Sequence, residues 1–269
     1  MGDVGGKRRA GRGRGRVKRR EVESEDGWTV VTHGLAGLSV NSNSHVKKKL
    51  DAGELPAKTL EGLTAEKLHA NLKGLQEQWK DTAVAKQIKE LVAGKSWNVK
   101  EAVCIGIGSF SRDWEHRHRS MWQLVLFLDV VEQLDLDIQM YSQDPAFTPL
   151  DLEFLRLLRI KTLTESVGAH ITDSSFVYSP FVDWYILLPA FLDSKNPELY
   201  VGNDILDDYG AYAQTEEKRE KLQKCNELGM HFLRDRACKK LREFEKHAHA
   251  LDGMVVYWKT TTDDGDPPA

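Results

Sequence analysis

A short glycine loop is the strongest candidate for chemistry in this sequence. After an apolar run at 102–105, the loop reads Gly106-Ile107-Gly108-Ser109-Phe110-Ser111. Glycines at the end of a strand let the backbone turn sharply and bring bare N–H groups to a ligand, normally a phosphate or a ribose. The dinucleotide fingerprint is incomplete, because Ser111 stands where the third glycine belongs, and no Gly-Lys-Ser/Thr follows. The loop therefore predicts either a ligand-binding cradle or a tight turn without a ligand.

Asp144 is the carboxylate that could complete such a site. An acidic residue at the end of the next strand would hold a ribose hydroxyl, but that strand is expected to end at Tyr141, three residues earlier. Asp144 also precedes Pro145, and an aspartate before a proline is a common turn former. Its role in binding and its role in a turn both remain open.

Histidines and cysteines are weaker candidates. His116 and His118 lie in a basic stretch that could face a phosphate or simply be solvated. His247 and His249 are two residues apart, so on a helix they do not face each other, which argues against a metal pair. The three cysteines fit no close-spaced metal pattern and leave one unpaired in any disulfide scheme, which favours a reducing, intracellular compartment. The sequence predicts no metal site and no catalytic residue, and any cofactor is unknown.

Strands alternate with helices around the loop. Strands are predicted at 102–110 (running into the glycine turn), 137–141, 160–163, 175–178, 198–202 and 254–259. Helices are predicted at 63–79, 84–94 and 121–131, after the capping residue Thr148, at 182–192 and over a long charged region, 215–251, which Gly229 could divide. This alternation favours βαβ units. We expect an α/β, Rossmann-like fold with a largely parallel sheet flanked by helices.

The charge is concentrated at the amino terminus. Residues 1–20 hold nine basic residues and one acid, a local charge of +8, which leaves −11 elsewhere because the whole chain carries −3. The segment Lys7–Arg20 is rich in glycine and arginine and predicts a disordered basic arm. Such an arm suits an import receptor, a nucleic-acid backbone or mere solubility. The nuclear-targeting candidates are Lys7, Arg8, Arg9, Lys18, Arg19 and Arg20.

The expected organisation has three parts. Residues 1–58 form the arm and a linker with a short ordered segment near 27–32, residues 59–259 form one α/β domain, and residues 260–269 form a disordered acidic tail. No apolar run reaches the roughly 18 residues that a membrane span needs, and no apolar stretch follows the basic start as it would in a secretory signal. We therefore expect no membrane partner.

Several ordered motifs form a family pattern. They are VCIGIGSFS at 103–111, MWQL at 121–124, QDPAFT at 143–148 and YVGN at 200–203, with DGWTVV at 26–31 as a lead-in. Together they resemble the sensitivity-to-red-light-reduced family, whose members carry an SRR-like domain. The resemblance implies a Rossmann-like domain and adds Gly202 and Asn203 to the candidate loop site. It also implies a regulatory role, in circadian-clock input and in haem biosynthesis, without an established reaction.

One motif departs from the family pattern. Members often carry Met-Pro-His-Cys where this chain reads Ser179-Pro180-Phe181-Val182. Metal, haem or thiol chemistry built on that His and Cys is therefore not carried over.

Two functions follow from the sequence. The first is a non-catalytic regulator of the nucleus and cytoplasm that binds protein partners, with weak nucleic-acid contact through the arm. The alternative is a cryptic Rossmann-like enzyme, such as an adenosyl-cofactor-dependent transferase, because one short Gly-x-Gly turn after the first strand is also how methyltransferases start.

Overall fold

The computed structural model describes residues 19–23, 29–33, 58–93, 95–113, 116–134, 137–165, 167–247 and 249–260. The chain divides into two units, residues 1–55 and 56–269, and each is described by itself. In the first unit, β1 (Arg19–Glu23) pairs antiparallel with β2 (Thr29–His33). Strand β2 falls where the ordered segment near 27–32 was predicted.

Strand β1 was not predicted, because its residues, RREVE, look like part of the basic arm. The two last targeting candidates, Arg19 and Arg20, begin this strand. The other four, Lys7, Arg8, Arg9 and Lys18, lie outside the described residues, as do most of the linker and the tail at 261–269. The predicted disorder of arm and tail and the predicted domain boundaries stay predictions.

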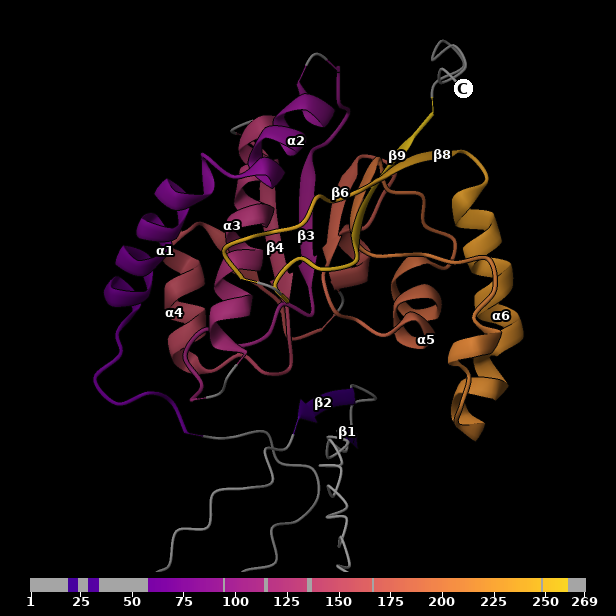
Figure 1. Ribbon diagram of the computed structural model, residues 1–269, viewed down its shortest axis with the longest axis horizontal. Helices are drawn as coiled ribbons and strands as arrows, with labels where there is room; N and C mark the ends of the chain where they lie inside the picture. The colour runs from indigo at the N-terminus through magenta and orange to yellow at the C-terminus, as the bar shows by residue number, and fades with distance from the viewer. Residues whose placement is uncertain are drawn as a thin grey trace, which may run out of the picture. The chain divides into compact units, whose positions relative to one another are not determined.

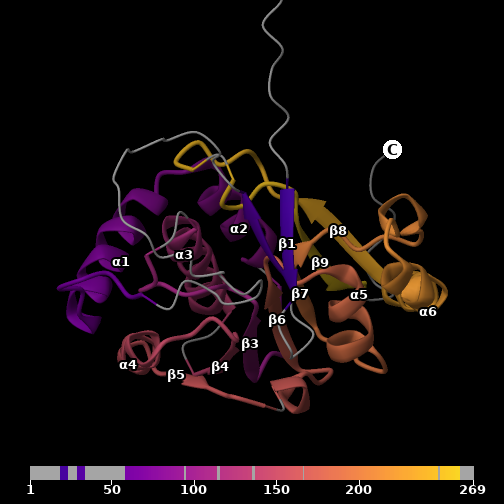
Figure 2. The same cartoon turned by 90° about the horizontal axis from the view of Figure 1, so that it is seen from below.

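A seven-stranded mixed sheet organises the second unit, in the order β5-β4-β3-β6-β7-β9-β8 (Figures 1 and 2). The strands are β3 (Glu101–Ile105), β4 (Gln139–Gln143), β5 (Ile160–Thr162), β6 (Ser175–Ser179), β7 (Leu199–Asn203), β8 (Arg236–Lys240) and β9 (Met254–Lys259). Strands β3 to β7 are parallel, and β9 is antiparallel to both of its neighbours. In chain order the parallel strands run 3-2-1-4-5, as in a doubly wound fold, which confirms the Rossmann-like prediction.

Helices cover both faces of this sheet. They are α1 (Ala65–Trp79), α2 (Ala83–Val92), α3 (Arg117–Leu134), α4 (Pro149–Leu157), α5 (Trp184–Leu187) and α6 (Glu216–Leu233), with the short helical turns η1 (Val167–His170), η2 (Leu188–Leu192) and η3 (Gly210–Tyr212). Helices α1 to α4 lie on one side of the sheet and α5 and α6 on the other (Figures 1 and 2). Within the described residues, no helix combines the length and the apolar character that crossing a membrane requires.

Threonine caps begin four of these helices, as local sequence rules predict. The side chains of Thr64, Thr82, Thr148 and Thr215 each accept a hydrogen bond from an amide three residues later. Aromatic side chains then join the layers: Phe127 of α3 lies 5.7 Å from the rings of both Phe176 and Tyr178 on β6. Local caps thus start the helices, and apolar burial holds them against the sheet.

The prediction of a long helix over 215–251 is wrong. Helix α6 ends at Leu233, and residues 236–240 form β8, an edge strand paired with β9. Its sequence, RACKK, shows no apolar alternation, because charged residues commonly protect exposed sheet edges. Gly229 does not break α6. A Cβ there would lie 2.0 Å from the carbonyl oxygen of Leu206, so the glycine lets the helix approach that loop closely.

The apolar segment 182–192 is helical but not regular. Tyr185 and Leu188 are buried as a continuous helix predicts, yet Phe191 is only partly buried and Leu192 takes the buried position. Leu188–Leu192 forms a π-helical turn. Leu192 follows Tyr185 by seven residues and Leu188 by four, and helix positions at these spacings share a face, whereas Phe191, six residues after Tyr185, turns away from it.

Candidate functional site

The glycine loop lies at the switch point of the doubly wound sheet, after β3 and beside β6. Such crevices, outside the carboxyl ends of the strands, are where open α/β sheets bind ligands. Gly106 has φ +72° and Gly108 has φ +82°, a conformation that side chains with a Cβ rarely adopt. The turn therefore needs both glycines, whether or not a ligand binds.

Asp144, which directly follows β4, is hydrogen-bonded to the glycine loop. Its carboxylate accepts hydrogen bonds from the amides of Gly108 and Ala146, both at 2.7 Å. Burial raises the pKa of Asp144 to about 6, against the opposite effect of these two amides. The carboxylate proposed to hold a ribose is thus bonded to the loop itself, and it also forms the turn expected before Pro145.

Asp151, in the first turn of α4, is also hydrogen-bonded to the glycine loop. It was not predicted from the sequence. Its buried carboxylate accepts from the Ser109 hydroxyl at 2.6 Å, the Phe110 amide at 3.0 Å and the Thr148 amide at 2.8 Å. The Thr148 side chain in turn accepts from the Asp151 amide, which completes a capping box. A Thr-x-x-Asp signature was readable at 148–151, but only the fold reveals that the same carboxylate holds the loop after β3.

The other polar groups of the loop are also hydrogen-bonded within the protein. The Ser109 hydroxyl oxygen accepts from the amides of Ser111 and Arg112, at 3.2 and 3.1 Å. The Ser111 and Thr148 hydroxyls lie 2.6 Å apart. On the outer side, the amide of Leu60 donates to the Ser111 carbonyl at 3.0 Å. A phosphate cradle needs free amides, and here most of them are engaged.

The structure brings together residues 106–111 and Asp144, but Gly202 and Asn203 lie elsewhere, at the end of β7. A Cβ on Gly202 would lie 2.3 Å from the Ser179 carbonyl oxygen, so this glycine serves the close pairing of β6 and β7. The Asn203 side chain donates to the Val182 carbonyl at 3.3 Å. Asn203 lines a separate cavity of about 210 Å³.

That cavity has an aromatic and acidic lining that sequence reasoning did not identify. The rings of Trp184 and Tyr209 stack with centroids 4.6 Å apart, and Asp183, Asp204 and Tyr212 also line the cavity, together with the aliphatic residues Val182, Leu187 and Leu206. Aromatic faces beside carboxylates suit a small flat or cationic group. The only indication in the sequence was a group of aromatic residues that follow the ends of β6 and β7, two adjacent strands. No known sequence motif has this pattern.

The other sequence candidates do not form a site. Cys104 of β3 is buried, and burial raises the pKa of its thiol well above the ordinary value. His247 and His249 lie in the loop after β8 and not on a helix. Phe181, at the position where family members often have His, lies under the guanidinium of Arg119 at 4.1 Å. Among the described residues, no three His, Cys, Asp or Glu side chains are grouped as metal ligands.

Strand order and glycine turn together define a Rossmann-like α/β protein. The family model described as the SRR1 domain matches residues 68–258, and the chain belongs to this family. Membership confirms the resemblance found in the sequence and supports a regulatory type of protein. Among curated proteins, no match to the chain was found.

Solved structures show a weaker likeness. Cofactor-bound Rv0187 from MTB is 10% identical with a TM-score of 0.39, over 71% of this chain and 89% of that one. An O-methyltransferase from Bacillus cereus in complex with SAH is 9% identical with a TM-score of 0.41, over 72% of this chain and 90% of that one. At these values the likeness carries no inference about a ligand or a reaction of this chain.

Proposed function

We propose that this chain is a non-catalytic regulatory protein that acts by binding protein partners. The observation that carries the proposal is that most polar groups of the glycine loop are already hydrogen-bonded within the protein. The amides of Gly106, Gly108, Phe110, Ser111 and Arg112 all donate to groups of the protein. Since a cradle for phosphate or ribose depends on such amides, the loop is better suited to shaping the domain than to holding a cofactor.

The alternative, an adenosyl-cofactor-dependent transferase, shares the strand order and the glycine turn. It would need the Asp144 carboxylate to face a ribose, whereas both of its oxygens accept from backbone amides of the protein. A cofactor would have to displace these bonds. This cost favours the regulatory proposal.

The test is a ligand screen on the full chain. We expect nucleotides, adenosyl cofactors and haem to produce no saturable thermal shift or calorimetric binding. Saturable binding that Gly108→Ala abolishes, and that the helix variant Gly74→Ala retains, would overturn the proposal, because it would place a ligand on the loop.

The finer part of the proposal concerns pathway and compartment. We place the regulatory role in circadian-clock input and haem biosynthesis, the roles that family resemblance implies. Because residues 1–20 carry +8, from nine basic residues and one acid, they would direct the protein to the nucleus as well as the cytoplasm and add weak nucleic-acid affinity. Deleting residues 1–20 should reduce the nuclear fraction of a fluorescent fusion, and an unchanged fraction would remove the targeting claim.

A further inference from the structure

Strand β5 is an edge strand of the seven-stranded sheet. Among the described residues only β4 pairs with it. The Leu163 amide donates to the Ser142 carbonyl at 2.9 Å, toward β4. Because backbone groups alternate in direction along a strand, the amide and carbonyl of Thr162 face the outer edge. This edge can accept another strand.

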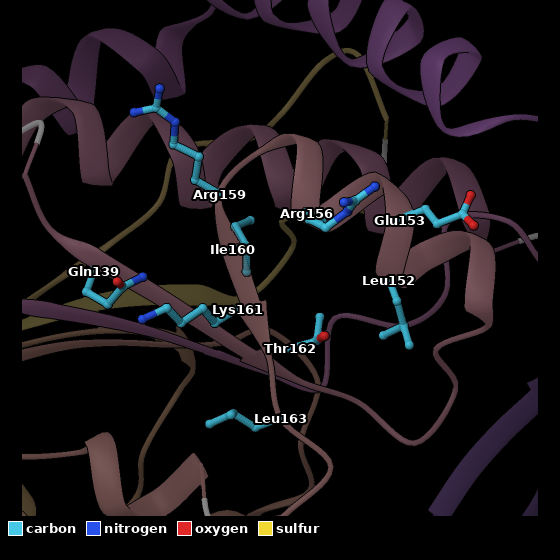
Figure 3. Close-up of a pocket in the computed structure, with 9 residues that line it drawn as sticks. All are labelled: Gln139, Leu152, Glu153, Arg156, Arg159, Ile160, Lys161, Thr162 and Leu163. Carbon is cyan, nitrogen blue, oxygen red and sulfur yellow. The ribbon is translucent and has the colours of Figure 1, made fainter.

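A groove of about 890 Å³ runs along this edge. Figure 3 shows its walls: Leu152, Glu153 and Arg156 come from α4, while Arg159 and Lys161 come from the edge itself and the turn before it. Leu152 is 43% exposed, and so is Leu157 on the same helix. The groove therefore offers apolar contact as well as backbone hydrogen bonds.

The charge of the groove is positive. Arg156, Arg159 and Lys161 are exposed, against the single carboxylate of Glu153. Within the part of the chain that the structure describes, no carboxylate pairs with either guanidinium. The Lys161 ammonium lies 5.7 Å from the centroid of the Tyr141 ring. These cations are available to an acidic partner.

Arg159 occupies a backbone position that does not favour arginine. Its φ is +59°, just after the end of α4. Glycine or asparagine normally ends a helix in this left-handed conformation. Any other residue there costs about 1 kcal/mol. The backbone conformation at this position is unfavourable for arginine. The contribution of Arg159 is therefore its charged side chain, which lies at the mouth of the groove.

The geometry points to a docking site at which an extended acidic segment of a protein partner adds to β5 as a strand. Its backbone would pair with Thr162, its apolar side chains would contact Leu152, and its carboxylates would meet Arg156 and Arg159. A second copy of this chain fits poorly, because two such edges would oppose cation with cation. A single-stranded nucleic acid would match the charge but not the apolar contact. The inference rests on the proposed function and names the kind of partner.

The probe is a fluorescein-labelled eight-residue peptide, Glu-Ser-Val-Ser-Glu-Ser-Val-Ser (the Glu-Val peptide), titrated by anisotropy with the full chain. Its glutamates and valines lie on the same face of a strand, as the contacts with Leu152 and Arg156 of α4 require. We expect saturable binding that falls with added salt. A Lys-Val peptide tests charge, and a Glu-Val peptide with alternate amides N-methylated tests backbone pairing. Both should bind at least about tenfold more weakly, which is roughly 1.4 kcal/mol.

Variants separate binding from folding. Arg159→Gly should weaken peptide binding about fivefold or more without lowering the melting temperature, since it relieves the positive φ. Ser194→Gly is the matched control, because Ser194 also has positive φ, +57°, but no charge and no place in the groove. It should leave binding unchanged.

Three results would overturn the inference. One is the absence of saturable Glu-Val binding up to about 1 mM. Another is equal binding of the N-methylated peptide. The third is binding of a single-stranded oligonucleotide, or self-association, that Arg159→Gly abolishes. None of these experiments tests ligand binding at the glycine loop. A ligand found at the loop would therefore contradict the proposed function without changing the meaning of the peptide result.

Discussion

The glycine loop and the groove along β5 differ in how their polar groups are used. In the loop, the amide of Gly108 donates to Asp144, and the Ser109 hydroxyl and the Phe110 amide donate to Asp151, so few polar groups are left for a ligand. In the groove, Arg156 and Arg159 are exposed, and the outer side of β5 pairs with no described residue. The comparison shows that residue types suited to chemistry can serve architecture, while ordinary surface residues can form the available binding site.

The largest expected effect comes from removing the carboxylate that closes the loop. Asp151→Ala should lower the free energy of unfolding by about 3–5 kcal/mol, because it leaves the buried Ser109 hydroxyl and the Phe110 and Thr148 amides without their acceptor. Urea unfolding measures this loss. Asp151→Asn keeps the shape and one acceptor and should cost less. A loss below about 1 kcal/mol would mean that the loop is less closed than the hydrogen bonds indicate.

The next effect concerns backbone conformation. Gly108→Ala should lower the free energy of unfolding by about 1–2 kcal/mol, because alanine is strained at φ +82°. The matched control is Gly74→Ala inside α1, where an added Cβ meets no atom within 4 Å. That change should stabilise the protein by up to about 1 kcal/mol, because alanine favours helices. Effects of equal sign would contradict the assigned role of the glycine turn.

A pH dependence isolates Asp144. The folded protein holds the Asp144 proton more tightly than the unfolded chain does, because the folded pKa is raised from 3.8 to about 6. This group's contribution to stability therefore falls as pH rises from about 4 to 6. Asp144→Asn lacks that titration, so relative to wild type it should gain roughly 2 kcal/mol between pH 4 and pH 7. Urea unfolding at both pH values measures the difference, and a constant offset would contradict the raised pKa.

The smallest effect belongs to the groove. Arg159→Gly should change the free energy of unfolding by less than about 1 kcal/mol, in the stabilising direction. Thermal unfolding beside Ser194→Gly provides the comparison. A marked destabilisation would show that the Arg159 side chain supports the fold, and the groove would then resemble the loop instead of contrasting with it.

Sequence reasoning succeeded where the deciding interactions are local. The strand ending near Gly106, the cap at Thr148 and the apolar helix at 121–131 all depend on residues within a few positions, and all appear in the structure. It failed for β8, whose charged residues become a strand only because β9 offers a partner. It also failed for Gly229, whose role depends on the Leu206 carbonyl on a distant loop.

For the candidate site, too, local features could be predicted from the sequence and long-range contacts could not. The sequence alone determined that a strand would end in a turn requiring glycine at 106 and 108, since backbone sterics act within one residue. Only the tertiary structure decided what the turn's amides would bond to, because Asp151 lies about 40 residues away and reaches Phe110 only once β3 and β4 are paired. The groove along β5 is likewise a product of strand order. A hydrogen-bond acceptor or an open sheet edge is defined by what the rest of the chain places beside it, and no local pattern contains that information.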